Sequence, residues 1–235
     1  MFEENVVAEL DNYALPTPSF LTIQSADKKY DLNAYIIKPS SLAPGKKYPV
    51  IMYQYNGPGE QIVVDKWGGV RMLWHRTMAE RGYIVFAVDG RGTPGRGRNF
   101  LNVLHKRLGN VELQDQLAGV EYLKTLQYID SSRMMIWGKS YGGFMTCMAL
   151  FTTHAFKLGI AVAPVTEWRN YDTHYTERFL ELPQENPEGY MLSSPIHFAS
   201  GLSGKFLLIH GVVDDNVHFQ DSMILAEELQ RANKQ

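Results

Sequence analysis

The sequence predicts an α/β fold with a mostly parallel sheet and helices on both of its faces. Apolar runs rich in β-branched residues, typical of buried strands, alternate along the chain with segments of helical spacing. That alternation indicates strand–helix units stacked into one sheet. With 235 residues and an apolar fraction of 45%, the chain can form one globular domain with a sizeable core.

The first half of the chain begins with a polar lead-in, residues 1–18, which ends in Pro16-Thr17-Pro18. Residues 19–235 are expected to form one α/β domain. Strands are predicted over 20–24, 32–38, 50–55 and 84–88, because these runs are alternating or continuously apolar. A helix is predicted over 71–81, with Met72, Leu73, Met78 and Ala79 on its apolar side. The loop 91–98 lacks a phosphate-binding pattern, and we expect it at the surface.

The second half repeats the same alternation. A helix over 111–126 is followed by strands over 134–137, 158–163 and 206–209, with a helix over 144–150 between the first two. A last helix is expected over 218–232. Residues 165–200 are rich in Trp, Tyr, His and Pro and have no clean period. Tyr55, Ser140, Val165 and Asp214 all lie at or just after the ends of predicted strands. Ligands in parallel sheets bind at the carboxyl ends of the strands, so this shared position indicates a site.

The stretch Gly138-Lys139-Ser140-Tyr141-Gly142-Gly143 lies between the strand over 134–137 and the helix that follows it. A G-x-S-x-G sequence in this position is typical of a strained turn that exposes a serine above an α/β-hydrolase sheet. Side chains in place of the glycines would collide with the neighbouring strand and helix. The sequence therefore predicts a serine hydrolase with Ser140 as nucleophile.

A serine nucleophile needs a histidine base, and that base needs a carboxylate to orient it. Asp214, one loop after the strand over 206–209, is the best carboxylate, with Asp215 or Asn216 expected to cap the next helix. His218 follows too closely to reach over the serine turn, and His210 is expected to be a packed core residue. His174 and His197 remain candidates for the base. We expect the chain to be truncated before the strand, histidine loop and helix that complete the domain.

Several motifs resemble those of the prolyl oligopeptidase family, and within it the dipeptidyl peptidase IV-like branch, from about Tyr48 to the end. The serine turn, Tyr53-Gln54-Tyr55-Asn56-Gly57-Pro58 and Asp89-Gly90-Arg91-Gly92 are similar to family loops. The segment from Ala163 to Arg178 is similar to the proline-pocket segment of that branch, and 210–220 to its acid loop. Lys139 stands where the family often has Trp.

This resemblance implies a role for each matching residue. Ser140 is the nucleophile, Asp214 the triad acid, and the Tyr55 hydroxyl and Tyr141 backbone N–H the oxyanion hole. Asn216 binds a substrate carbonyl, and a flat apolar pocket accepts a proline ring. The residues implied in that pocket are Tyr141, Val165, Trp168, Tyr171, Tyr175 and Val217. Without the resemblance, Trp168, Tyr171 and Tyr175 would be interpreted as ordinary core or surface aromatics.

The implied function is a serine peptidase that releases dipeptides after a penultimate Pro or Ala, although this chain, lacking the histidine, is expected to be inactive. The alternatives are an acylaminoacyl peptidase or prolyl endopeptidase of the same family, or a non-catalytic binding module. The expected partner is a peptide substrate with Pro or Ala at its second position, and no cofactor or metal is expected. The unpaired strand over 206–209 would favour association into a homo-oligomer.

Composition excludes some other classes of function. A net charge of −2 and a pI near 6.4 give no reason to expect binding to nucleic acid or to an anionic membrane. No apolar run approaches the ~20 residues of a membrane span, and the first residues lack the pattern of a signal peptide. Cys147 is the only cysteine, and it is expected to be a small buried residue instead of a nucleophile.

Overall fold

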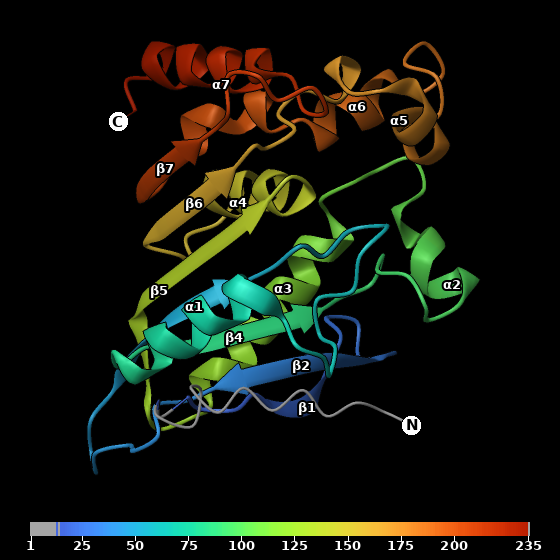
Figure 1. Ribbon diagram of the computed structural model, residues 1–235. Coiled ribbons are helices and arrows are strands. Elements are labelled where there is room, and N and C mark those ends of the chain that lie inside the picture. The colour runs from blue at the N-terminus through green and yellow to red at the C-terminus, as the bar shows by residue number, and fades with distance from the viewer. Residues whose placement is uncertain (1–12, 14, 235) are drawn as a thin grey trace.

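A seven-stranded sheet forms the centre of the computed structural model, which describes residue 13 and residues 15–234 (Figure 1). The strand order is β1-β2-β4-β3-β5-β6-β7. β1 and β2 pair antiparallel, as do β2 and β4, and the remaining neighbours pair in parallel. The mostly parallel sheet is thus confirmed. The strands are β1 (Ser19–Gln24), β2 (Asp31–Ile37), β3 (Tyr48–Tyr53), β4 (Ile84–Asp89), β5 (Ile129–Lys139), β6 (Leu158–Val162) and β7 (Lys205–Ile209).

Helices cover both faces of this sheet. α1 (Gly69–Glu80) lies on one face over β2 and β4, while α3 (Val111–Lys124) and α4 (Tyr141–Thr152) pack on the other face against β5 (Figure 1). Each face has its own apolar core, and the larger one lies beneath α3 and α4. The other helical segments are α2 (Arg98–Leu101), η2 (Asn102–Leu104), η3 (Trp168–Asn170), α5 (Thr173–Leu180), α6 (Pro187–Ser193), η4 (Pro195–Gly201) and α7 (Phe219–Arg231).

Most predicted elements are confirmed to within a few residues. The strand expected over 134–137 is longer, and that expected over 50–55 ends at Tyr53. Asn56, just beyond it, has a φ of 56°, a left-handed conformation that turns the chain away from the sheet. The aromatic-rich residues 165–200 contain four short helical segments, each too brief for a clear period. Most of the lead-in predicted for residues 1–18 lies outside the described residues.

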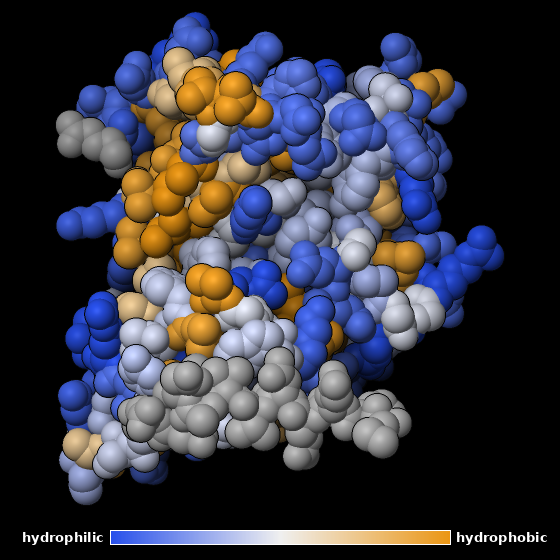
Figure 2. Space-filling view, in the orientation of Figure 1, coloured by the Kyte–Doolittle hydropathy of each residue, from blue (hydrophilic) through white to orange (hydrophobic). Residues whose placement is uncertain are grey.

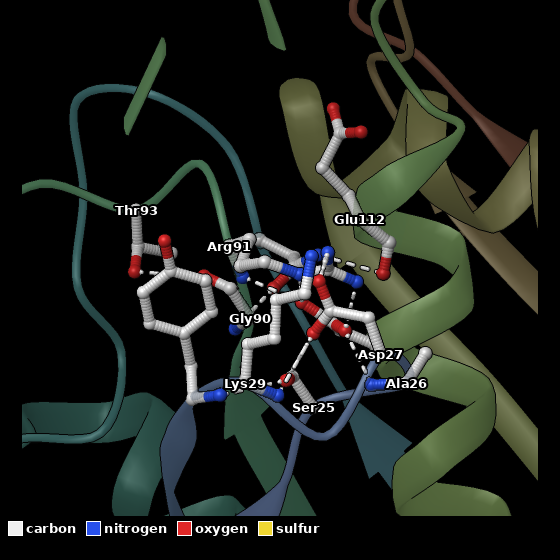
Figure 3. Close-up of polar contacts among 11 residues, drawn as sticks. Ser25, Ala26, Asp27, Lys29, Gly90, Arg91, Thr93 and Glu112 are labelled. Atoms are coloured by element: carbon white, nitrogen blue, oxygen red, sulfur yellow. Dashed lines mark hydrogen bonds and ion pairs between the residues drawn. The ribbon is translucent and has the colours of Figure 1, made fainter. Parts of the chain in front are cut away.

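The prediction of an exposed loop over 91–98 is wrong at its first three residues, which are buried. The Arg91 side chain is 7% exposed, and it contacts two carboxylates. One is Asp115 on α3, and the other is Asp27 in the turn between β1 and β2, which Figure 3 shows beside Arg91. Arg91 Nη2 lies 2.8 Å from Asp115 Oδ1, and Arg91 Nη1 lies 2.8 Å from Asp27 Oδ2. The loop therefore enters the fold because an ion-pair cluster holds its start between two other elements.

β7 is the edge strand of the described sheet, as the sequence predicts, since its only described partner is β6. Leu207 and Ile209 are 48% and 46% exposed on one face of β7. Figure 2 shows hydrophobic side chains gathered at the β7 end of the sheet. They lie on the same face of the sheet that α1 covers near β2 and β4. Association through this face stays a prediction. Within the described part of the chain, no helix is both long and apolar enough to cross a bilayer.

Candidate active site

Ser140 lies at a sharp turn between the end of β5 and the start of α4. Its φ and ψ are 59° and −120°, a conformation that costs a non-glycine residue of order 1–3 kcal/mol. The surrounding backbone holds this turn in place: Ser140 N donates to Val162 O at 2.8 Å, and Phe144 N donates to Ser140 O at 2.9 Å. The side chain is thereby held at the carboxyl end of the sheet.

The glycines of this turn are needed because other backbone lies very close. A Cβ on Gly138 would lie 2.5 Å from the carbonyl oxygen of Gln54, and one on Gly142 would lie 2.4 Å from the same atom. A Cβ on Gly143 would lie 2.8 Å from Val162 O. Backbone atoms of two neighbouring strand ends cannot move aside, so larger residues are excluded. The collisions predicted from the sequence are confirmed.

Tyr55 lies two residues beyond the end of β3, beside the serine turn. Burial, the largest influence, raises the pKa of Tyr55 to about 12, while the nearby Ser140 side chain lowers it in part. The phenol therefore keeps its proton at neutral pH and can donate it in a hydrogen bond. The Tyr55 and Tyr141 rings lie next to each other, with centroids 5.8 Å apart.

Gln54 is a residue of this site that the sequence analysis missed. It is fully buried, and its Nε2 donates to Gly142 O at 2.6 Å and to Thr146 Oγ1 at 3.3 Å. These bonds tie the segment that carries Tyr55 to α4, the helix that follows Ser140. The signal that could have found Gln54 in the sequence is its place as a polar residue near the end of the otherwise apolar strand predicted over 50–55.

An aromatic cluster continues from Tyr141 into the segment that had no period. The Trp168 centroid lies 5.8 Å from that of Tyr141, 5.9 Å from that of Tyr171 and 6.1 Å from that of Tyr175, whose ring is stacked parallel to it. The Tyr175 hydroxyl donates to Pro58 O at 3.1 Å. The structure thus brings together the aromatic residues predicted from the sequence, and their rings join the Tyr55 loop to η3 and α5.

The segment from 165 to 171, which carries Trp168 and Tyr171, is held in place by buried polar contacts. Asp221 on α7 accepts hydrogen bonds from Thr166 N at 2.9 Å and from Asn170 Nδ2 at 2.9 Å. Trp168 is 1% exposed, and its indole Nε1 donates to Ser193 O at 2.9 Å. Val165 and Val217, each 2% exposed, belong to the same apolar core. The segment from 165 to 171 is therefore held against α7 in one arrangement.

Asp214 organises the loop between β7 and α7. Its Oδ1 accepts hydrogen bonds from Val217 N at 3.0 Å and from Asn216 N at 3.1 Å, which hold the pKa of this carboxyl below its usual range. Asn216 Oδ1 accepts from the Tyr171 hydroxyl at 3.1 Å, so the loop meets the aromatic cluster. The predicted cap by Asp215 or Asn216 is wrong: α7 starts after His218, without a side-chain cap. Asp214 itself makes the local backbone bonds, because the loop makes a further turn before the helix begins.

Among the described histidines, none has a hydrogen bond to the Ser140 hydroxyl. His210 is packed as predicted, with a side chain 1% exposed, Nδ1 2.6 Å from Ser222 Oγ and Nε2 2.8 Å from Val217 O. Its Nε2 also lies 3.6 Å from Asp214 Oδ2. Of the two candidates that the sequence left open, His197 faces Glu167 at 3.4 Å and His174 is exposed. His218, at the start of α7, is exposed as well.

A groove of about 430 Å³ lies beside the aromatic cluster and shares Tyr175 with it. Its lining is Pro58, Gly59, Pro94, Leu101, Asp172, His174, Tyr175, Arg178 and Phe179. Cys147 is buried in α4, and burial raises the pKa of its thiol far above the ordinary value, as suits a packing residue. No group of three or more His, Cys, Asp or Glu within residues 15–234 could hold a metal ion.

A family model, described as the prolyl oligopeptidase family, matches residues 72–235. The chain belongs to the prolyl oligopeptidase family. Members of this family are serine-type peptidases, and the matched region contains Ser140 and Asp214. The resemblance found in the sequence is confirmed.

Curated relatives and a solved structure agree with this assignment. The chain is 45% identical over 200 residues to a "Probable dipeptidyl-aminopeptidase B" of Ajellomyces capsulatus, covering 83% of this chain and 21% of the relative. It is 39% identical over 230 residues to a "Probable dipeptidyl peptidase 4" of Emericella nidulans, covering 95% of this chain and 29% of that protein. The crystal structure of Porphyromonas gingivalis dipeptidyl peptidase 4 matches with a TM-score of 0.94 and 42% identity, covering 99% of this chain and 33% of that one. The chain thus spans about a fifth to a third of the length of these relatives, and the fold is the α/β-hydrolase fold.

Proposed function

We propose that this chain is the hydrolase region of a dipeptidyl peptidase that cleaves after a penultimate Pro or Ala, with Ser140 as nucleophile. The observation that carries the proposal is the convergence of Ser140, held in a strained conformation, with the Tyr55 hydroxyl and the aromatic cluster. A proline ring is rigid and apolar, and a box of aromatic rings offers it contact without a polar partner.

In this mechanism Ser140 Oγ attacks the carbonyl carbon of the bond that follows the second residue of the substrate. The negative charge that develops on the carbonyl oxygen accepts hydrogen bonds from the Tyr55 hydroxyl and the Tyr141 backbone N–H. Each such donor contributes roughly 3 kcal/mol to the stability of the transition state. A histidine base takes the Ser140 proton and passes it to the leaving amine; water then hydrolyses the acyl-enzyme and releases the dipeptide.

The remaining roles concern the base and the substrate backbone. We assign Asp214 as the acid that orients the base and Asn216 as a donor to a substrate carbonyl. We assign the base to a histidine other than His210, whose two nitrogens already have partners, and His218, which lies four residues from Asp214. None of the described histidines has a hydrogen bond to the Ser140 hydroxyl. Without this base, residues 1–235 keep at most the modest rate that the oxyanion hole and binding provide.

The test uses the expressed full-length protein and two chromogenic substrates, one carrying Gly-Pro and one acetyl-Ala. We expect faster release from Gly-Pro, and a preference for acetyl-Ala would overturn the dipeptidyl assignment. A fluorophosphonate probe tests the nucleophile, because it labels activated serines. Labelling that persists in Ser140→Ala, or that is absent from the wild type, would overturn Ser140 as the nucleophile.

A further inference from the structure

The first turn of α3 lies against both loops of the proposed oxyanion hole. Glu112, in this turn, is completely buried, and its Oε1 accepts hydrogen bonds from the Tyr141 hydroxyl at 2.6 Å and from Gly109 N at 2.8 Å. The backbone oxygen of Glu112 accepts from Asn56 Nδ2 at 3.0 Å, and Asn56 directly follows Tyr55. One residue of α3 therefore contacts the neighbours of both Tyr55 and Ser140.

The position of the Tyr141 ring matters for both loops. A Cβ on Gly57 would lie 2.2 Å from Tyr141 Cδ1, so the loop after Tyr55 rests directly on this ring. The ring also contacts Tyr55 and Trp168, with centroid distances of 5.8 Å to each. Because Tyr141 is the residue after Ser140, any rotation of its side chain would disturb the loop that carries Tyr55 as well as the serine turn.

The Glu112 carboxyl is an expensive group to bury for packing alone. Its Oε2 has no hydrogen-bond partner among the described residues, and burial raises the pKa of Glu112 to about 7. A buried carboxyl oxygen without a partner destabilises the folded state. A carboxyl makes two contacts here that an apolar side chain could not, the hydrogen bonds from Gly109 N and from the Tyr141 hydroxyl, and the second of them reaches the residue after Ser140.

We propose that Glu112 is a positioning residue, which holds the Tyr141 phenol and thereby keeps the Tyr141 N–H and the Tyr55 loop aligned on the substrate carbonyl. It acts through Tyr141 and touches no reacting atom. This inference rests on the proposed function.

The test compares Glu112→Leu, Tyr141→Phe and the double variant in the full-length protein with the Gly-Pro substrate. Loss of a hydrogen bond to a carboxyl predicts that kcat falls roughly tenfold or more in each single variant, with little change in KM. The double variant is expected to be no slower than the single ones, because both remove the same bond. Glu112→Gln, which keeps an acceptor oxygen, restores kcat to within about threefold of wild type.

Glu121→Gln is the matched control, because Glu121 lies on the same helix with a side chain 69% exposed; its kcat stays at the wild-type value. Tyr141→Phe keeps the ring and tests the bond even if Glu112→Leu fails to fold. A wild-type kcat in Tyr141→Phe, or additive losses in the double variant, would overturn the role of Glu112 and leave the proposed function standing. A wild type that neither cleaves Gly-Pro nor reacts with the fluorophosphonate would overturn the proposed function and this inference together.

Discussion

The two carboxylates that bind Arg91 differ in burial, and this difference predicts very different costs for the same chemical change. Asp115 is fully buried and accepts hydrogen bonds from Arg91 N at 2.8 Å, Nε at 2.9 Å and Nη2 at 2.8 Å, and from Ala26 N at 3.0 Å. Asp27 is 32% exposed and accepts from Arg91 only Nη1, at 2.8 Å, while its other oxygen accepts from Ser25 Oγ at 2.7 Å and Lys29 N at 3.1 Å. The comparison of Asp115→Asn with Asp27→Asn therefore keeps the arginine and the substitution constant and varies only the environment.

Asp115→Asn leaves the guanidinium, 7% exposed, without its main counter-charge and turns an amide NH₂ toward its donors. Breaking a buried pair costs about 3–5 kcal/mol, and because Asp27 still compensates in part we expect about 3 kcal/mol. In a chain of this size that lowers Tm by roughly 6–12 °C. Asp27→Asn removes a solvated contact and is expected to cost at most about 1 kcal/mol.

The assay is urea unfolding followed by tryptophan fluorescence, with Tm from calorimetry as a second measure. The reasoning predicts a large loss of unfolding free energy in Asp115→Asn and a small one in Asp27→Asn. Equal losses in the two variants would refute it, because burial would then not decide the strength of the cluster. A stable Asp115→Asn protein would mean that Arg91 moves out to solvent when its partner changes.

Three further predictions concern the site and its surroundings. Tyr55→Phe removes one proposed oxyanion donor and should lower kcat for the Gly-Pro substrate roughly 100-fold with little change in KM; an unchanged kcat would exclude the hydroxyl from the mechanism. Glu112→Gln removes a buried acid whose pKa is raised from 4.5 to about 7. The unfolded chain releases this proton at a lower pH than the folded protein does. The unfolding free energy of the wild type should therefore fall relative to that of the variant as pH rises from about 4.5 to 7, by up to about 3 kcal/mol. A difference in urea midpoint that does not change with pH would contradict this. Gly142→Ala places a Cβ 2.4 Å from Gln54 O and should abolish soluble, folded protein, whereas Gly211→Ala, with open space around it, should leave the yield unchanged; equal yields would refute the argument from close backbone approach.

Much of the fold could be predicted from the sequence because local patterns encode it. The order of strands and helices followed from apolar periodicity, and the serine turn followed from a G-x-S-x-G pattern between a predicted strand and a helix. The backbone that approaches its glycines belongs to the ends of two neighbouring strands. The residues of the candidate site followed from motifs, and the structure places the aromatic ones side by side. The interpretation of Asp215 or Asn216 as a cap failed, because the exact start of a helix depends on how the preceding loop packs.

The tertiary structure alone decided which polar residues are buried together. Arg91 meets Asp115 and Asp27 from 24 and 64 positions away, and Tyr141 meets Glu112 across 29 positions. On α3 the polar residues Glu112, Asp115 and Gln116 are buried, as are Leu113 and Leu123. A prediction from apolar periodicity would place these three polar residues on the solvent-exposed face of the helix. A buried charge is stable only where its partners converge in space, and spacing along the chain carries no record of that convergence.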